Sequence, residues 1–184
     1  MDLVNVIQNG ETQSVEFKKS LNQMKEGCKA LCGMLNTDMG AGMVFFGISP
    51  ENEIIGIEGN LDSAQRTLAQ HIQVKFDPSL ICSIKVEDYE GKKIIVISAN
   101  RSSIIPYYEY DSRAFIKEGS TKRCLSIAEK NILLTKRDRD RHNGPWKCDK
   151  CGSIAGSLSS IVITKDGPIK SYKCHCGGEY WPYK

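Results

Sequence analysis

Residues 13–48 have the sequence QSVEFKKSLNQMKEGCKALCGMLNTDMGAGMVFFGI, in which the spacing of apolar side chains changes twice. Residues 13–18 alternate polar and apolar side chains, which is typical of a β-strand with one buried face. Apolar residues then recur every three or four positions and predict an amphipathic helix over residues 21–36. The apolar run at 43–48 predicts a buried strand. The stretch therefore predicts a strand, a helix and a second strand.

The chain on the C-terminal side of this stretch continues the mixture of strands and helices. Residues 53–57 are apolar enough to pair with the strand at 43–48 as a hairpin, and Pro50 and Asn52 supply the turn chemistry between them. Periodicity further predicts helices at 62–74 and 126–135 and strands at 80–88, 92–99 and 114–117. We expect an α+β domain with a mostly antiparallel sheet and two or three helices on one side.

The triplet Asn143-Gly144-Pro145 interrupts the pattern and predicts a domain boundary. The expected domains are residues 1–142 and a small module at residues 143–184. The formal net charge is only +3, so overall charge does not indicate a nucleic-acid partner. No apolar run is long enough to span a membrane, and the N-terminus lacks the pattern of a signal peptide, so we expect a cytoplasmic protein without membrane contact.

The small module holds four of the eight cysteines, in two close pairs on either side of a predicted hairpin. Four thiolates at this spacing can surround Zn²⁺ tetrahedrally, and glycines after each pair permit the tight turns of a zinc ribbon. The predicted ligands of this structural zinc are Cys148, Cys151, Cys174 and Cys176. Four free thiols or a regulatory disulfide are the alternatives.

Two glutamates, Glu11 and Glu16, flank the start of the first predicted strand. Carboxylates that converge on one point can hold Mg²⁺ or Mn²⁺ beside a phosphodiester. Spacing alone is weak support for such a site, because exposed glutamates are common on protein surfaces.

The order of several short motifs resembles the core domain of the Schlafen family, which is also described as AlbA-like. The pattern Glu-x4-Glu-Phe-Lys is followed by a helix, then Asn36-Thr37-Asp38, then a strand that ends in Phe46-Gly47-Ile48. Ile55-Gly56-Ile57, Pro106-Tyr107-Tyr108 and the sequence AFIKEGST at 114–121 are similar to later parts of the family pattern. The resemblance covers residues 11 to about 134 and implies a nucleic-acid-binding α+β domain.

In the better understood members, the resemblance implies a metal-dependent endoribonuclease that acts on tRNA and rRNA. Two glutamates with the spacing of Glu11 and Glu16 there join a third acid. The family usually has Asp-Asp directly after the Phe-Gly-Ile motif, whereas this chain has Ser49-Pro50. Glu51 follows one position later and is the candidate third acid, so the catalytic residues that this hypothesis names are Glu11, Glu16 and Glu51.

Basic residues near these motifs are candidates for contact with the phosphates of a tRNA-like RNA or of DNA. They are Lys18, Lys19, Lys117, Lys122 and Arg123. The alternative for each is an ordinary solvated charge.

Three functions stay open at this point. The first is a Schlafen-like endoribonuclease with a zinc-ribbon appendage. The second is a non-catalytic DNA- or RNA-binding regulatory module, which the unmatched third acid favours. The third is an adaptor that docks a protein partner through the zinc ribbon. Self-association into a homo-oligomer is open in all three.

Overall fold

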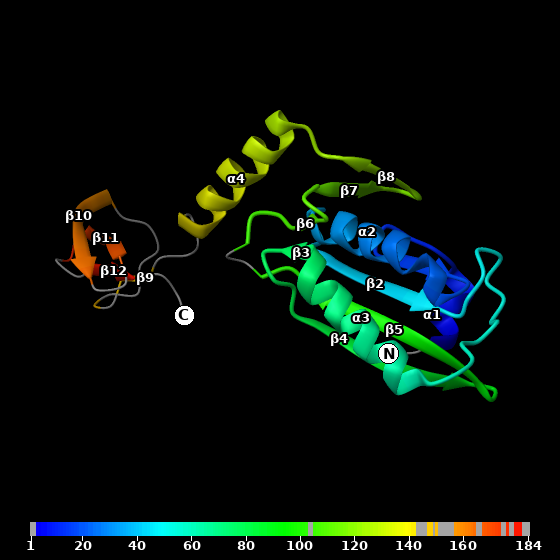
Figure 1. Cartoon of the computed structure of the whole chain (residues 1–184). Helices are drawn as coiled ribbons and strands as arrows, with labels where there is room; N and C mark the ends of the chain where they lie inside the picture. Colours follow the sequence, from blue (N-terminus) through cyan, green and yellow to red (C-terminus); the bar gives the residue numbers. More distant parts are fainter. Residues whose placement is uncertain are drawn as a thin grey trace. The chain divides into compact units, whose positions relative to one another are not determined.

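The structure, a computed structural model, describes residues 3–102, 105–142, 147–148, 150, 157–164, 167–173, 176 and 179–181 (Figure 1). The chain divides into two compact units, Met1–Leu134 and Thr135–Lys184. The break predicted at residues 143–145 lies outside the described residues. None of the helices in the described ranges combines the length and the apolar character that a membrane crossing requires.

A four-stranded sheet forms the centre of the first unit, in the order β1-β2-β5-β4. β1 and β2 are parallel, and the other neighbours are antiparallel. The strands are β1 (Val15–Lys18), β2 (Ala41–Phe46), β4 (Cys82–Tyr89) and β5 (Lys92–Asn100). The predicted α+β class with a mostly antiparallel sheet is therefore confirmed.

The parallel pair requires a crossover, and the short 3-10 helix η1 (Leu21–Gln23) and helix α2 (Met24–Leu35) provide it. α2 packs against both β1 and β2 and, elsewhere, against β7 (Phe115–Glu118). Two glycines of α2 allow these close approaches. A Cβ on Gly27 would lie 2.8 Å from the Phe46 ring, and one on Gly33 would lie 3.0 Å from the main-chain nitrogen of Lys117.

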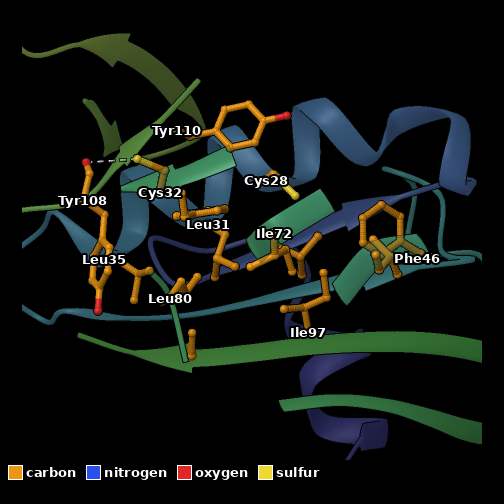
Figure 2. Close-up of a cluster of buried hydrophobic side chains, with 14 of the residues drawn as sticks. Cys28, Leu31, Cys32, Leu35, Phe46, Ile72, Leu80, Ile97, Tyr108 and Tyr110 are labelled. Carbon is orange, nitrogen blue, oxygen red and sulfur yellow. Dashed lines mark hydrogen bonds between the residues drawn. The ribbon is translucent and has the colours of Figure 1, made fainter. Parts of the chain in front are cut away.

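Alternate residues of β2 and β5 point to opposite sides of the sheet. Buried side chains lie on both sides. Val44, Phe46 and Ile97 pack with α2 and α3 (Leu61–Lys75) in the core that Figure 2 shows. Phe45 points to the other face, where it packs with Ile7 of α1 (Leu3–Asn9). The sequence did not predict α1, so the expectation of helices on one side only was incomplete.

The predicted hairpin between residues 43–48 and 53–57 was wrong. The two segments share one isolated antiparallel bridge, between Ile48 and Ile54, and form no strand ladder. Gly47 (φ 100°) and Gly56 (φ 88°) turn the chain away from a strand path, and Gly56 donates its N–H to the Gly47 carbonyl at 2.9 Å. β5 instead takes the antiparallel position beside β2.

Shorter elements complete the two units. In the first, β3 (Phe76–Asp77) pairs with β6 (Glu109–Tyr110), and β7 pairs with β8 (Thr121–Cys124). α4 (Ile127–His142) extends further than the predicted helix at 126–135. The second unit is an antiparallel sheet in the order β10-β11-β12-β9, with a hairpin where the sequence places one. Its strands are β9 (Lys147–Cys148), β10 (Ser157–Thr164), β11 (Gly167–Lys173) and β12 (Glu179–Trp181).

Candidate functional site

Glu16 lies at the centre of a group of lysines that we call the Glu16 cluster, made of Glu16, Lys18, Lys117 and Lys122. β1 pairs Glu16 with Val44 and so turns its side chain to the α2 side of the sheet, where it is only 3% exposed. The Nζ atoms of Lys18 and Lys122 lie 2.8 and 2.7 Å from Oε1. The Nζ atom of Lys117 lies 2.8 Å from Oε2. Three ammonium groups thus surround one buried carboxylate.

Lys117 is completely buried, and its ammonium group faces three acceptors. It donates hydrogen bonds to the carbonyl oxygens of Thr12 at 2.8 Å and Val15 at 2.9 Å. Its ammonium group is not aligned for a hydrogen bond to Oε2 of Glu16. The contact is an ion pair, in which attraction between opposite charges stabilises the buried oxygen. Lys117 therefore attaches β7 to the start of β1 and is not exposed to a ligand.

The electrostatics of the cluster keep Glu16 ionised. Burial raises the pKa of its carboxyl, but the contacts with Lys117, Lys122 and Lys18 lower it more, to about 2. Glu11 is the second carboxylate nearby, with Oε1 3.9 Å from Lys18 Nζ. Three ammonium groups against two carboxylates leave one positive charge in excess, at the rim where Lys18 and Lys122 are 12% and 21% exposed.

Glu26 of α2 is also close enough for its charge to act on Lys122 and Lys18. It has a partner of its own, however, because Lys29 Nζ lies 2.7 Å from its Oε1 on the same helix. The pair is neutral together, so it does not remove the positive excess of the Glu16 cluster.

The three predicted acids do not meet at one point. Glu11 Oε1 accepts the main-chain N–H of Phe17 at 2.8 Å, which places it beside Lys18. Glu51 is exposed in the turn after β2, and its nearest described cation is Lys19, with Nζ 4.0 Å from Oε2. No contact in the described part of the chain joins Glu51 to Glu11 or Glu16. Among the described residues, no group of three or more histidine, cysteine or acidic side chains could hold a metal ion.

Two amide side chains that the sequence reasoning missed hold the β7–β8 hairpin in place. Gln13 donates to the Lys117 carbonyl and accepts the N–H of Gly119 at 2.9 Å. Asn36 is 1% exposed and donates to the carbonyls of Tyr108 and Phe115, each at 2.8 Å. Its Oδ1 accepts the N–H of Tyr108 at 2.8 Å. The motif Asn36-Thr37 pointed to this position but not to its role.

The hairpin carries the remaining candidate contacts. Arg123 on β8 is half exposed, and its Nη2 lies 2.7 Å from Glu118 Oε1 and 2.7 Å from Glu129 Oε1. Lys19 is exposed at the end of β1. Of the five basic residues expected at a phosphate, four therefore have surface, and Lys117 supports them from inside.

The predicted zinc ligands fall largely outside the described residues. Cys151 and Cys174 lie outside them, and only the backbone of Cys148 is described, in β9, where it pairs with Tyr180 of β12. Cys176 lies in a turn between β11 and β12. The zinc ribbon stays a prediction.

Comparison with known proteins gives a family and a fold. The sequence model of the family described as Schlafen, AlbA_2 matches residues 11–126. Among curated proteins, none matches the chain. The crystal structure of the DIP2311 protein from Corynebacterium diphtheriae is similar with a TM-score of 0.50 and 17% identity, over 83% of this chain and 26% of that one. The chain therefore spans about a quarter of that protein, and the likeness shows the fold alone.

A second solved structure is the N-terminal domain of a RecG-related protein from Nitrosomonas europaea, determined by NMR. It has a TM-score of 0.49 and 20% identity, over 68% of this chain and 88% of that domain.

Proposed function

The chain belongs to the Schlafen AlbA_2 family, and from this premise we propose that its first unit binds structured RNA through the rim of the Glu16 cluster without cutting it. Membership of this family indicates a nucleic-acid-binding domain. The observation that carries the proposal is the excess of positive charge around Glu16, where Lys18 and Lys122 reach the surface from two different strands. Lys19 and Arg123 lie on the same two segments, but Lys19 pairs with Glu51 and Arg123 with Glu118 and Glu129, so the positive excess comes from Lys18 and Lys122.

Glu16 supports this role as a buried counter-ion. A lysine head group on a flexible stem loses conformational freedom when it binds a phosphate. The carboxylate of Glu16 already holds the Nζ atoms of Lys18 and Lys122 within 2.8 Å, so part of that ordering is complete before a ligand arrives. A polyanion would meet two positioned ammonium groups at the junction of β1 and β8.

The same contacts disfavour the endoribonuclease hypothesis. Mg²⁺ and Mn²⁺ bind to the lone pairs of carboxylate oxygens. In this chain both oxygens of Glu16 face ammonium groups within 2.8 Å, and Glu51 pairs with Lys19 instead. A divalent cation does not fit this arrangement, so we favour the non-catalytic alternative.

Titration of a labelled tRNA at several salt concentrations tests binding. We expect Lys122→Ala to weaken binding and to reduce the slope of log affinity against log salt by about 1, as the loss of one phosphate contact predicts. Lys85→Ala is the matched control, because Lys85 is an exposed lysine on β4. Equal effects of the two variants, or no binding at low salt, would contradict the proposal. Competition with DNA of the same length distinguishes the two nucleic acids.

Incubation of tRNA with the protein and Mn²⁺ tests the absence of cleavage. We expect the RNA to stay intact with the unmodified protein and with Glu16→Gln. Cleavage by the unmodified protein that disappears in Glu16→Gln would establish the endoribonuclease and overturn this part of the proposal.

We further propose that the second unit binds one structural Zn²⁺ through Cys148, Cys151, Cys174 and Cys176. The support is the pairing of β9 with β12 and the turn at Cys176, which bring the chain around both cysteine pairs into one small sheet. Elemental analysis should find about one zinc per chain, and less in Cys176→Ser. Cys124→Ser is the control, because Cys124 is an exposed cysteine of the first unit. Full zinc content in Cys176→Ser would contradict the ligand set.

A further inference from the structure

A cavity of about 910 Å³ opens where β2 begins and β5 ends. Its walls differ in chemistry. Met39, Met43 and Ile81 supply apolar surface, whereas Ser98, Asn100 and Arg101 supply hydroxyl, amide and guanidinium groups. Ser98 lies beside Met43 across the β2–β5 pair, so polar and apolar walls meet within the sheet itself. The volume is within the range of about 300–1,000 Å³ that is usual for small-molecule sites.

The turn that carries Met39 is held rigidly by Arg101. Arg101 Nη1 donates to the Leu35 carbonyl at 2.6 Å and to the Thr37 carbonyl at 2.7 Å. The main-chain N–H of Arg101 donates to the carbonyl oxygen of Gly40 at 2.6 Å. Gly40 has φ +60°, and a Cβ there would lie 2.9 Å from Arg101 Cζ. The turn therefore has little freedom, yet it leaves the Met39 side chain 65% exposed. A large apolar side chain on a fixed turn is available for contact, and the backbone of the turn needs little further ordering.

Met39 also lines a second, smaller cavity, of about 350 Å³, whose other walls include Gln13, Lys117 and Glu118. Gln13 and Lys117 attach β7 to the start of β1, and Lys117 is itself part of the Glu16 cluster. Met39 thus separates the large cavity from the segment that positions the proposed phosphate contacts. Because Met39 lines both cavities, the large cavity adjoins the segment that anchors β7, and a strand bound at the cluster rim is the occupant to test there.

The charge in the large cavity agrees with such an occupant. Among the described residues, the side-chain hydrogen bonds of Arg101 come from Nη1, and a guanidinium group has further N–H donors whose geometry suits a phosphate. Asp38, on the same turn, acts on the charge of Arg101 and opposes an anion there. We propose that the large cavity holds one unpaired nucleotide of the bound strand, with its base against Met39 and Ile81 and its phosphate at Arg101. This inference rests on the proposed nucleic-acid binding and adds a preference for unpaired positions.

Titration of a single-stranded RNA that contains 2-aminopurine, and of the duplex with the same sequence, tests the inference. Met39→Ala should weaken single-strand binding by about fivefold, leave duplex binding unchanged and remove the change in 2-aminopurine fluorescence. Val74→Ala is the matched control, because Val74 is 78% exposed on α3 and lines neither cavity. Asp38→Asn, which removes the opposing charge, should strengthen single-strand binding by about threefold.

The outcomes separate this inference from the function beneath it. If Lys122→Ala weakens binding but Met39→Ala does not, the nucleotide cavity is overturned while RNA binding stands. If the unmodified protein binds neither strand form at low salt, both are overturned. If Met39→Ala instead changes the sedimentation coefficient of the protein, the turn is a contact between copies of the chain, and the nucleotide cavity is overturned.

Discussion

Glu16 and Glu129 are two carboxyls whose pKa is lowered to about 2, and lysine or arginine partners are responsible in both. Burial raises the pKa of Glu16, and Lys117, Lys122 and Lys18 outweigh it. The pKa of Glu129 is lowered by hydrogen bonds from Arg123 and from Ser126, just before α4, at the protein surface. The pKa values agree, but their meaning for stability differs. Water and salt screen the exposed pair, whereas they reach the buried cluster poorly.

The difference also concerns what each group connects. The Glu16 cluster joins β1 to β7 and β8 across about a hundred residues of sequence, with a lysine that has no access to water. Glu118 and Glu129, by contrast, lie only five and six residues from Arg123, on neighbouring elements. Removal of a buried partner leaves a charge uncompensated, and removal of an exposed one leaves a charge in solvent.

Glu16→Ala is expected to have the largest effect. It leaves the ammonium of Lys117 buried with two carbonyl acceptors and no counter-charge, which should lower the free energy of unfolding by about 3–5 kcal/mol. Urea denaturation followed by circular dichroism measures the change, and Glu129→Ala is the control on the exposed side. The double variant Glu16→Leu with Lys117→Met should recover much of the loss. Equal shifts for Glu16→Ala and Glu129→Ala would remove the distinction between the two groups.

Asn36→Ala should follow in size. The substitution removes the amide donor to the carbonyls of Tyr108 and Phe115 and the acceptor of the Tyr108 N–H, and the Tyr108 carbonyl keeps the weak S–H donor of Cys32 at 3.3 Å. Because the site is buried, we expect a loss of about 2–3 kcal/mol in the free energy of unfolding. The same urea titration checks it, with Gln73→Ala at an exposed position of α3 as control. A loss no greater than that of the control would show that the amide does not hold the hairpin.

A pH titration of stability tests the electrostatics of the buried carboxyl, Glu16. Glu16 has a folded pKa of about 2, below its ordinary value of 4.5, so its contribution is present above pH 4.5 and is lost as pH falls toward 2. The unmodified protein should therefore lose more stability over this range than Glu16→Gln does, and high salt should change the difference little. Parallel curves for the two proteins would contradict the assignment.

Arg123→Ala should have the smallest effect on stability. Its pKa is raised by Glu129 and Glu118, but the group is exposed to solvent and its ion pairs are screened. We expect no measurable change in the urea midpoint and a weaker affinity for RNA with a shallower salt dependence. A clear drop in the midpoint would show that the exposed group supports the hairpin as the buried cluster does.

Periodicity was sufficient for the main elements of the fold. The alternation at residues 13–18, the helical spacing after Leu21 and the apolar run ending at Phe46 each reflect burial of one face, and local spacing encodes such burial directly. It was insufficient for residues 53–57, because two glycines with positive φ redirect a segment that is apolar enough for a strand. It also missed α1, which contributes the buried Ile7 and the partly buried Val6 to the described packing.

The candidate site was predicted only as a set of residue types. Glu11, Glu16 and the basic residues were all named, but their spacing could not show that lysines surround Glu16, because Lys117 and Lys122 come from more than a hundred residues further along the chain. Nothing local distinguishes Lys117, which is buried, from Lys122, which is not. The role of Asn36 depends on partners 72 and 79 positions away and is hidden for the same reason.

The order of synthesis gives the long separation within the Glu16 cluster a consequence for folding. A ribosome makes Glu16 and Lys18 early and Lys117 and Lys122 about a hundred residues later. Until then β1, a strand of four residues at the edge of the sheet, lacks the contacts of Lys117 and Lys122 with Glu16. Contacts of such high sequence separation form late and slow the search for the native state. The edge of the sheet that carries Glu16 therefore gains these lysine contacts only after most of the first unit has been synthesised.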